Sequence, residues 1–156
     1  MPRAPHRLAE LLAAYVVADY RWQRDGHWFP LVVGQRAPGI DDAFPVATHF
    51  AALSAWNPDS VPQHEHINRA ADEALQAALE DSGFAYRPAF AAARNRSWKE
   101  SSWLVVDMPA GEFDALSRRF GQLGTLCWQR GQPVRLRMDA ARPATVPDHA
   151  FVDWLK

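Results

Sequence analysis

The sequence predicts an α+β fold: a single domain over residues 1–156, with a mixed or mostly antiparallel sheet of about five or six strands and two or three packed helices. Strand-like segments come in pairs between single helical segments, which disfavours the strict alternation of a parallel α/β fold. No long polar linker divides the chain. With 156 residues, 48% of them hydrophobic, the chain is long enough to bury a core without disulfides.

Apolar residues at i, i+3, i+4, i+7 and i+8 predict a first helix over residues 8–18. They are Leu8, Leu11, Leu12, Tyr15 and Val16. The two arginines before this run also suit a signal peptide, but Glu10 interrupts the run and favours a helix of the mature protein.

The next segments are shorter. Residues 19–24 are either the end of the first helix or a short strand. Residues 27–34 are rich in aromatic and β-branched side chains and predict a strand, which Pro30 assigns to an edge or a bulge. Residues 35–46 carry glycine, prolines and adjacent aspartates, as is typical of a surface loop.

A nearly unbroken apolar run at residues 49–56 predicts a central strand that is buried on both faces. The longest helix is expected directly afterwards, over residues 61–82, with Ser60 and Gln63 as a capping box and Gly83 at its end. The expected apolar stripe comprises Ile67, Ala70, Ala71, Ala74, Leu75, Ala78 and Leu79.

Four more strands are predicted at residues 84–91, 102–107, 125–129 and 134–138, and a short helix at residues 111–120. The tail, residues 140–156, is expected to dock on the domain through its last aromatic residues.

The composition argues against several classes of function. The 17 Lys and Arg nearly balance the 18 Asp and Glu, so nucleic acid is an unlikely partner. No stretch has the roughly 20 apolar residues of a membrane span, so no membrane association is expected. The lone Cys127 lies in a strand-like context and fits a reducing cytoplasm. The oligomeric state is left open.

The segment at residues 54–60, Ser-Ala-Trp-Asn-Pro-Asp-Ser, is the most informative feature. Asn57 leaves the buried strand beside the expected helix start, where free N–H groups suit a small polar or anionic ligand. The same residues also suit an ordinary turn, in which Ser60 occupies those N–H groups itself. Asn57 and Ser60 are therefore candidate ligand-binding residues.

Asn68 is expected on the inward side of the long helix, where a buried amide needs partners. These are either backbone groups of the sheet or a ligand beside Asn57. Gln122, after the short helix, is either a cap or a polar pocket wall. Asn68 and Gln122 complete the candidate ligand-binding set.

Glu100 lies between Trp98 and an apolar strand. If it is desolvated, its carboxyl group has a raised pKa and suits a general acid or base, which makes it the candidate catalytic residue. The alternative is a strand-end carboxylate paired with Lys99, Arg94 or Arg96.

No metal site and no cofactor are expected. His64 and His66, two positions apart, diverge by about 200° on a helix. Glycine-rich phosphate loops and a nucleophile elbow are missing from the sequence.

On these residues the chain resembles a family of uncharacterised bacterial proteins, a domain of unknown function with the motif Ser/Thr-Ala-Trp/Tyr-Asn-Pro-x-Ser, here residues 54–60. The other matching positions are Asp19 and Tyr20, Asn68 and Arg69, Trp98-x-Glu100 and Phe120-Gly121-Gln122. The resemblance implies a small bacterial cytoplasmic protein and brings no activity with it. It also implies that Asn57, Asn68, Glu100 and Gln122 belong to one shared site or one structural network.

Two hypotheses follow. The first is a small-molecule or nucleotide binding domain with a polar pocket at Asn57-Pro58; whether it is also an enzyme, with Glu100 as acid or base, is left open. The alternative is a protein interaction module in which the motif is structural. That alternative predicts an exposed cluster containing some of Trp22, Trp28, Trp98 and Trp154.

Overall fold

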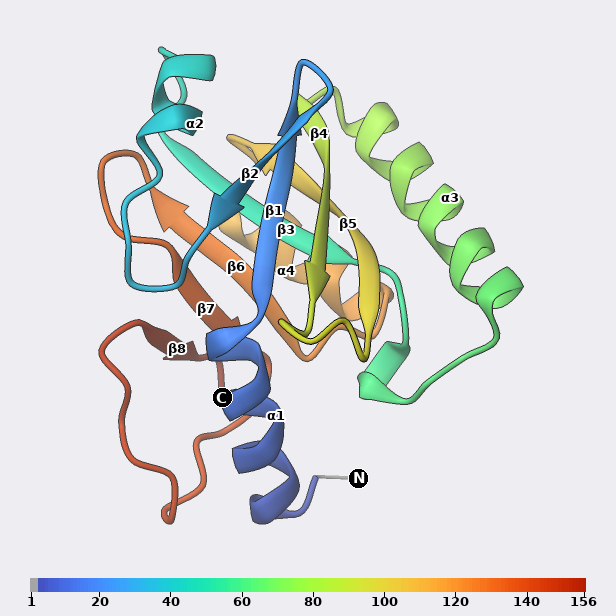
Figure 1. The fold of residues 1–156 in the computed structure, drawn as a ribbon, viewed down its shortest axis with the longest axis vertical. Helices are drawn as coiled ribbons and strands as arrows, with labels where there is room; N and C mark the ends of the chain where they lie inside the picture. The colour runs from blue at the N-terminus through green and yellow to red at the C-terminus, as the bar shows by residue number, and fades with distance from the viewer. Residues whose placement is uncertain (1–2) are drawn as a thin grey trace.

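The computed structural model describes residues 3–156, which form one eight-stranded mixed sheet and four α-helices (Figure 1). The elements in chain order are α1 (Pro5–Val17), β1 (Asp19–Arg24), β2 (His27–Leu31), α2 (Pro38–Ala43), β3 (His49–Ser54), the 3₁₀ turn η1 (Pro58–Ser60), α3 (Glu65–Ser82), β4 (Tyr86–Ala92), β5 (Lys99–Val106), α4 (Ala110–Arg119), β6 (Gly124–Gln129), β7 (Arg135–Met138) and β8 (Val152–Trp154). The α+β class is thus confirmed.

The strands lie in the order β2-β1-β4-β5-β3-β6-β7-β8, and every neighbouring pair is antiparallel except β7 and β8. The sheet curls until the segment after β2, at one edge, reaches the start of β7 near the other edge. Val33, just after β2, forms a bridge with Val134, and Gly34 N donates to Val134 O at 2.8 Å. The curled sheet therefore encloses one core, against which α1 also packs, and α3 and α4 cover its outer face.

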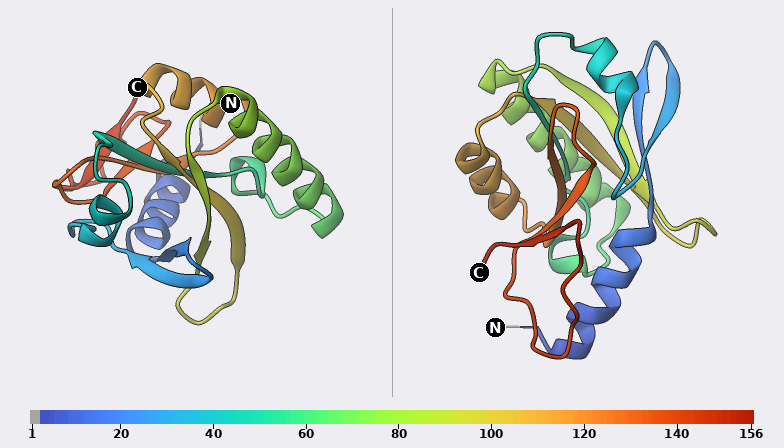
Figure 2. Two further views of the ribbon diagram at one scale, coloured as in Figure 1. Left: turned by 90° about the horizontal axis from the view of Figure 1, so that it is seen from above. Right: turned by 90° about the vertical axis from the view of Figure 1, so that its left-hand side faces the viewer.

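Each face of the sheet has its own hydrophobic core. On the inner side, residues such as Phe50 and Leu104 pack with Leu12 of α1. On the outer side, which α3 and α4 cover (Figure 2), Leu53 packs with residues of both helices. Strand β3 supplies both cores alternately, which explains its unbroken apolar sequence and confirms the prediction of a central strand.

The predicted numbers of strands and helices were too low. Strand β1 occupies residues 19–24, for which the sequence allowed either the end of the first helix or a short strand. Strand β8 forms in the tail by pairing with β7. Helix α2 lies within the segment predicted as a loop and buries Ile40. These elements have three to six residues, too few for a periodic pattern, so neighbouring segments stabilise them.

The predicted start of the long helix was wrong. Helix α3 begins at Glu65 with no side-chain cap, and Ser60 lies in η1 with a left-handed φ of 57°. Val61 is extended, because a residue before proline disfavours the α conformation. The proposed capping box of Ser60 and Gln63 is therefore not formed.

The buried face of α3 is also rotated from the predicted stripe. Ile67 is 43% exposed, whereas Asn68, Leu75 and Leu79 are buried. Asn68 is only 2% exposed, which confirms its inward position. The buried face of α3 therefore begins with a polar residue in the first turn of the helix, followed by Leu75 and Leu79.

None of the helices described for residues 3–156 combines the length and the apolar content that a bilayer crossing requires.

Candidate functional site

The turn after β3 has an unusual backbone. Asn57, Asp59 and Ser60 all have left-handed conformations, with φ between 48° and 58°. Such a conformation costs a residue other than glycine about 1 kcal/mol or more, although Asn and Asp tolerate it best. A turn of this kind persists only where its surroundings hold it.

Asn57 is the centre of the hydrogen bonds that hold this turn. Its backbone N–H donates to Asn68 Oδ1 at 2.9 Å, and Asn68 Nδ2 donates to Asn57 Oδ1 at 2.8 Å. The Gln63 N–H donates to the same Asn57 Oδ1 at 2.9 Å. Asn57 Nδ2 donates to Glu100 Oε1 at 2.9 Å. The two asparagines thus connect η1, α3 and β5.

The segment after α4 holds the other side of the turn. Gly121 O accepts a hydrogen bond from Asp59 N at 2.8 Å. Gln122 Nε2 donates to Trp56 O and to Phe120 O, both at 3.1 Å. A Cβ atom at Gly121 would lie 2.8 Å from Cβ of Pro58, so only glycine allows this close approach.

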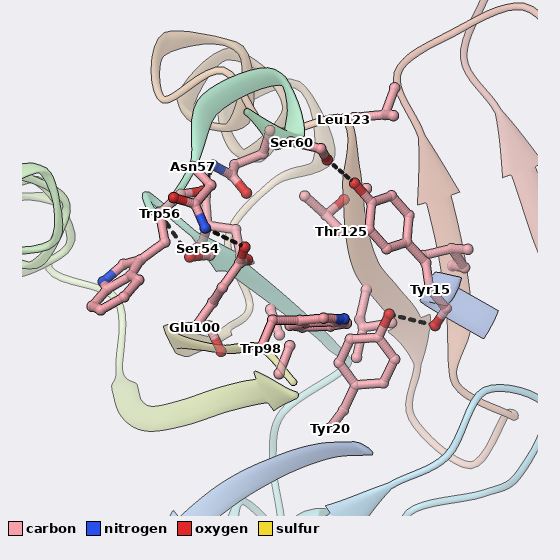
Figure 3. Close-up of a pocket in the computed structure, with 18 residues that line it drawn as sticks. Tyr15, Tyr20, Ser54, Trp56, Asn57, Ser60, Trp98, Glu100, Leu123 and Thr125 are labelled. Carbon is pink, nitrogen blue, oxygen red and sulfur yellow. Dashed lines mark hydrogen bonds between the residues drawn. The ribbon is translucent and has the colours of Figure 1, made fainter. Parts of the chain in front are cut away.

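A cavity lies directly beside this network, on the inner side of the sheet (Figure 3). Its inner part, which we call the inner pocket, has a volume of about 60 Å³, and an adjoining outer hollow has about 300 Å³. The residues that line both parts are Tyr15, Asn57, Ser60, Trp98 and Glu100. The two parts therefore form one cleft, with space in the inner pocket for a few waters or one small functional group.

Aromatic side chains form much of the wall of the inner pocket. Tyr15 and Ser60 share a hydrogen bond between their hydroxyl groups, and the Tyr20 hydroxyl donates to the Tyr15 carbonyl oxygen. Burial raises the pKa of both tyrosines, so both are neutral phenols at neutral pH. In Figure 3 the Ser60–Tyr15 bond and the Asn57–Glu100 bond lie on opposite sides of the pocket.

Glu100 is the acidic group of the inner pocket. Burial raises the pKa of its carboxyl group, although the hydrogen bond from Asn57 acts in the opposite direction. Within residues 3–156, Glu100 forms no ion pair. Arg96 instead donates to Asp19 Oδ2 at 2.8 Å, and Arg94 donates to Val17 O at 3.0 Å. The alternative in which an arginine or Lys99 neutralises Glu100 is thus not realised.

The candidate residues from the sequence fall into two groups. Asn57, Ser60, Glu100 and Gln122 line the inner pocket. Asn68 lies behind Asn57, and both polar atoms of its amide are engaged in hydrogen bonds to the chain. Three aromatic residues of the pocket wall were not predicted as part of the site: Tyr15, Tyr20 and Trp98. Tyr15 was recognised as part of an apolar helix face, which carries no sign of a cavity.

The histidines before and within α3 lie outside the cleft. The His64 and His66 rings stack with their centroids 5.8 Å apart, and both residues are exposed. The described part of the chain holds no group of three or more potential metal-ligating side chains.

The raised pKa of Glu100 predicts how stability depends on pH. A carboxyl group whose pKa is higher in the folded state makes the protein lose stability as pH rises from the unfolded value of about 4.3 through the folded value. Glu100→Gln keeps an oxygen acceptor for Asn57 but does not ionise. The variant is therefore expected to melt above the wild type at pH 7 to 8, with a difference that shrinks toward pH 4. Thermal melts of both proteins across this range would check it, and a difference independent of pH would contradict it.

One comparison with known proteins found a match. The family model described as a protein of unknown function (DUF3293) matches residues 53–124, slightly less than half of the chain. That range contains Asn57, Asn68, Glu100 and Gln122, but not Tyr15 or Tyr20. The searches of curated proteins and of solved structures found no match. The match supports an uncharacterised family and provides no activity.

Proposed function

We propose that the cleft beside the Asn57 turn binds a small polar molecule and that Glu100 is its principal contact. The observation that carries the proposal is a desolvated carboxyl group that faces an inner pocket lined by no cationic side chain from residues 3–156. Burying an acidic group in this way is unfavourable, and such groups are more common at functional sites than elsewhere. A purely structural network needs no cavity beside it.

The other motif residues have positioning roles in this proposal. Asn68 holds Asn57, and Asn57 in turn holds one oxygen of Glu100. Gln122 and Gly121 fix the turn from the side of α4. Rigid support of this kind keeps a functional side chain in place while solvent or a ligand occupies the cavity.

Glu100 is also the group best suited to chemistry. With a raised pKa it exchanges a proton at a pH closer to neutral than an ordinary carboxyl group does. This supports a role as general acid or base if the bound molecule reacts. The lone cysteine and the resemblance to a bacterial family favour a cytoplasmic location.

The interaction-module alternative has less support. It predicts an exposed cluster with some of four tryptophans, but Trp22 is only 2% exposed, Trp98 lines the cleft and Trp154 is half-buried. Trp28 is 39% exposed, and its ring packs edge-on against Phe90. An exposed tryptophan cluster is therefore not the dominant feature of the described surface.

A thermal-shift screen of the full chain against nucleotides, sugar phosphates, amines and metabolite acids tests the proposal. A molecule that binds in the cleft is expected to raise the melting temperature of the wild type and of Glu80→Gln, because Glu80 is an exposed residue of α3. The same molecule should have a much smaller effect on Glu100→Gln and Trp98→Ala. A ligand whose effect is equal in all four proteins would show that binding occurs elsewhere.

A further inference from the structure

We propose that the group placed against Glu100 is a protonated amine of a small organic cation. This inference rests on the proposed function and specifies its ligand class. Among residues 3–156, no Lys, Arg or His lines the inner pocket, whose ionisable groups are Glu100 and the neutral phenols of Tyr15 and Tyr20. A ligand cation would supply a partner for the half-buried carboxylate of Glu100.

The side chains that line the outer hollow do not change the net negative charge of the cleft. It adds Arg7 and Glu10 of α1, whose side chains lie 3.5 Å apart as an ion pair. Their charges largely offset each other, and both side chains are exposed to solvent. The charge that an incoming ligand meets without a protein partner is therefore that of Glu100.

One carboxylate oxygen of Glu100 is also free to accept a hydrogen bond from a ligand. Asn57 Nδ2 contacts Oε1 of Glu100, whereas Oε2 receives no hydrogen bond from residues 3–156. The Tyr15 and Ser60 hydroxyls bond to each other. An ammonium group has donors only, so it matches an unoccupied carboxylate oxygen better than an anion does.

The aromatic wall favours the same class of ligand. Trp98, Tyr15 and Tyr20 line the inner pocket beside Glu100. Aromatic rings stabilise organic cations through their faces while excluding water. The inner pocket of about 60 Å³ suits an ammonium head with one or two carbons, and the outer hollow of about 300 Å³ suits the remainder of the molecule.

The backbone near Asn57 is less suited to binding an anion. The expected anion site was the start of the long helix beside Asn57, but α3 begins at Glu65. The intervening Gln63 N–H is already bound to Asn57 Oδ1 at 2.9 Å. The other backbone donors of the turn are also engaged within the chain: Asp59 N donates to Gly121 O, Ser60 N to Asn57 O and Val61 N to Pro58 O.

The test uses three matched probes, benzylamine, benzyl alcohol and benzoate, with methylamine and butylamine as smaller amines. Titration calorimetry on the full chain is expected to give binding of at least one amine, with benzyl alcohol and benzoate weaker by about tenfold or more where benzylamine binds. Glu100→Gln should lose a similar factor in amine affinity, while Glu80→Gln should not. Circular dichroism and the melting temperature of each variant would confirm that it is folded.

A second readout is the proton released on binding. The amine requires an ionised Glu100, so its affinity should fall as pH drops through the pKa of that group, and calorimetry in buffers of different ionisation enthalpy should detect the proton. The ionisable groups that face Glu100 across the cleft are Tyr15, Tyr20, Arg7 and Glu10. Both tyrosines stay neutral in this range, and a proton release that disappears in Glu100→Gln is assigned to Glu100 and not to Glu10.

The outcomes separate this inference from the proposed function. Equal or tighter binding of benzyl alcohol or benzoate, lost in Glu100→Gln, would overturn the amine and leave the binding cleft in place. Failure of all three amines would overturn the amine as well. If the wider screen also yields no molecule whose effect depends on Glu100, the proposed function fails with it.

Discussion

Asn68→Ala is expected to lower the free energy of unfolding by about 3 kcal/mol, the largest loss for a single side chain of the asparagine network. The truncation removes the acceptor of the Asn57 N–H and the donor to Asn57 Oδ1. These groups lie in a partly buried turn, where an unpaired polar group costs about 1 to 3 kcal/mol. The higher helix propensity of alanine offsets only about 0.6 kcal/mol of this loss. Denaturant unfolding of both proteins measures the difference.

Two further variants test whether the loss comes from the network. Arg69→Ala, at the next position of α3, removes an exposed ion pair with Glu65 and should cost about 0.5 kcal/mol or less. Asn68→Asp keeps one acceptor but places an oxygen against Asn57 Oδ1, so it should be no more stable than Asn68→Ala at neutral pH. An Asn68→Ala protein as stable as Arg69→Ala would mean that the network contributes little.

Gly121→Ala is expected to cost about 3 kcal/mol, from two effects of similar size. Gly121 has a φ of 67°, which alanine adopts at a cost of about 1 to 2 kcal/mol. Its Cβ would also lie 2.8 Å from Cβ and 3.4 Å from Cα of Pro58, and relieving such a contact costs about 1 to 3 kcal/mol. The turn of η1 would have to move to accept it.

Gly131→Ala is a matched control for the backbone effect. Gly131 has a φ of 75°, but a Cβ there would meet no atom within 4 Å. Its cost should therefore be about 1 to 2 kcal/mol, the conformational part alone. Equal losses in the two variants would contradict the close contact between Gly121 and Pro58. A ligand that binds the cleft should also bind Gly121→Ala more weakly, because Asn57 precedes the displaced Pro58.

The sequence alone was sufficient for the elements with a long or unbroken pattern. Helix α1 and strand β3 were predicted because one buried face or two buried faces determine their residues. The edge position of β2 followed from Pro30. The inward position of Asn68 followed from helical periodicity, and the motif indicated the right region of the chain for the cleft.

The local geometry of the turn could not be predicted in this way. Ser60 matched a capping box in spacing, yet its hydroxyl bonds to Tyr15, which is 45 positions away. The left-handed conformations of three residues before α3 depend on groups from β5 and from the segment after α4. Local propensity contains no information about partners this distant in the sequence.

The α+β class, the central strand and the polar residues at its end were thus predictable from the amino-acid sequence, because they depend on periodicity and residue type. Which of those residues face the cleft followed from the three-dimensional packing. It placed Asn68 behind Asn57 and Glu100 beside Tyr15 and Trp98, through contacts between α1, η1, α3 and β5. The physical reason is that burial and hydrogen bonding of a side chain depend on its neighbours in space, and the curled sheet brings together neighbours that are far apart in the sequence.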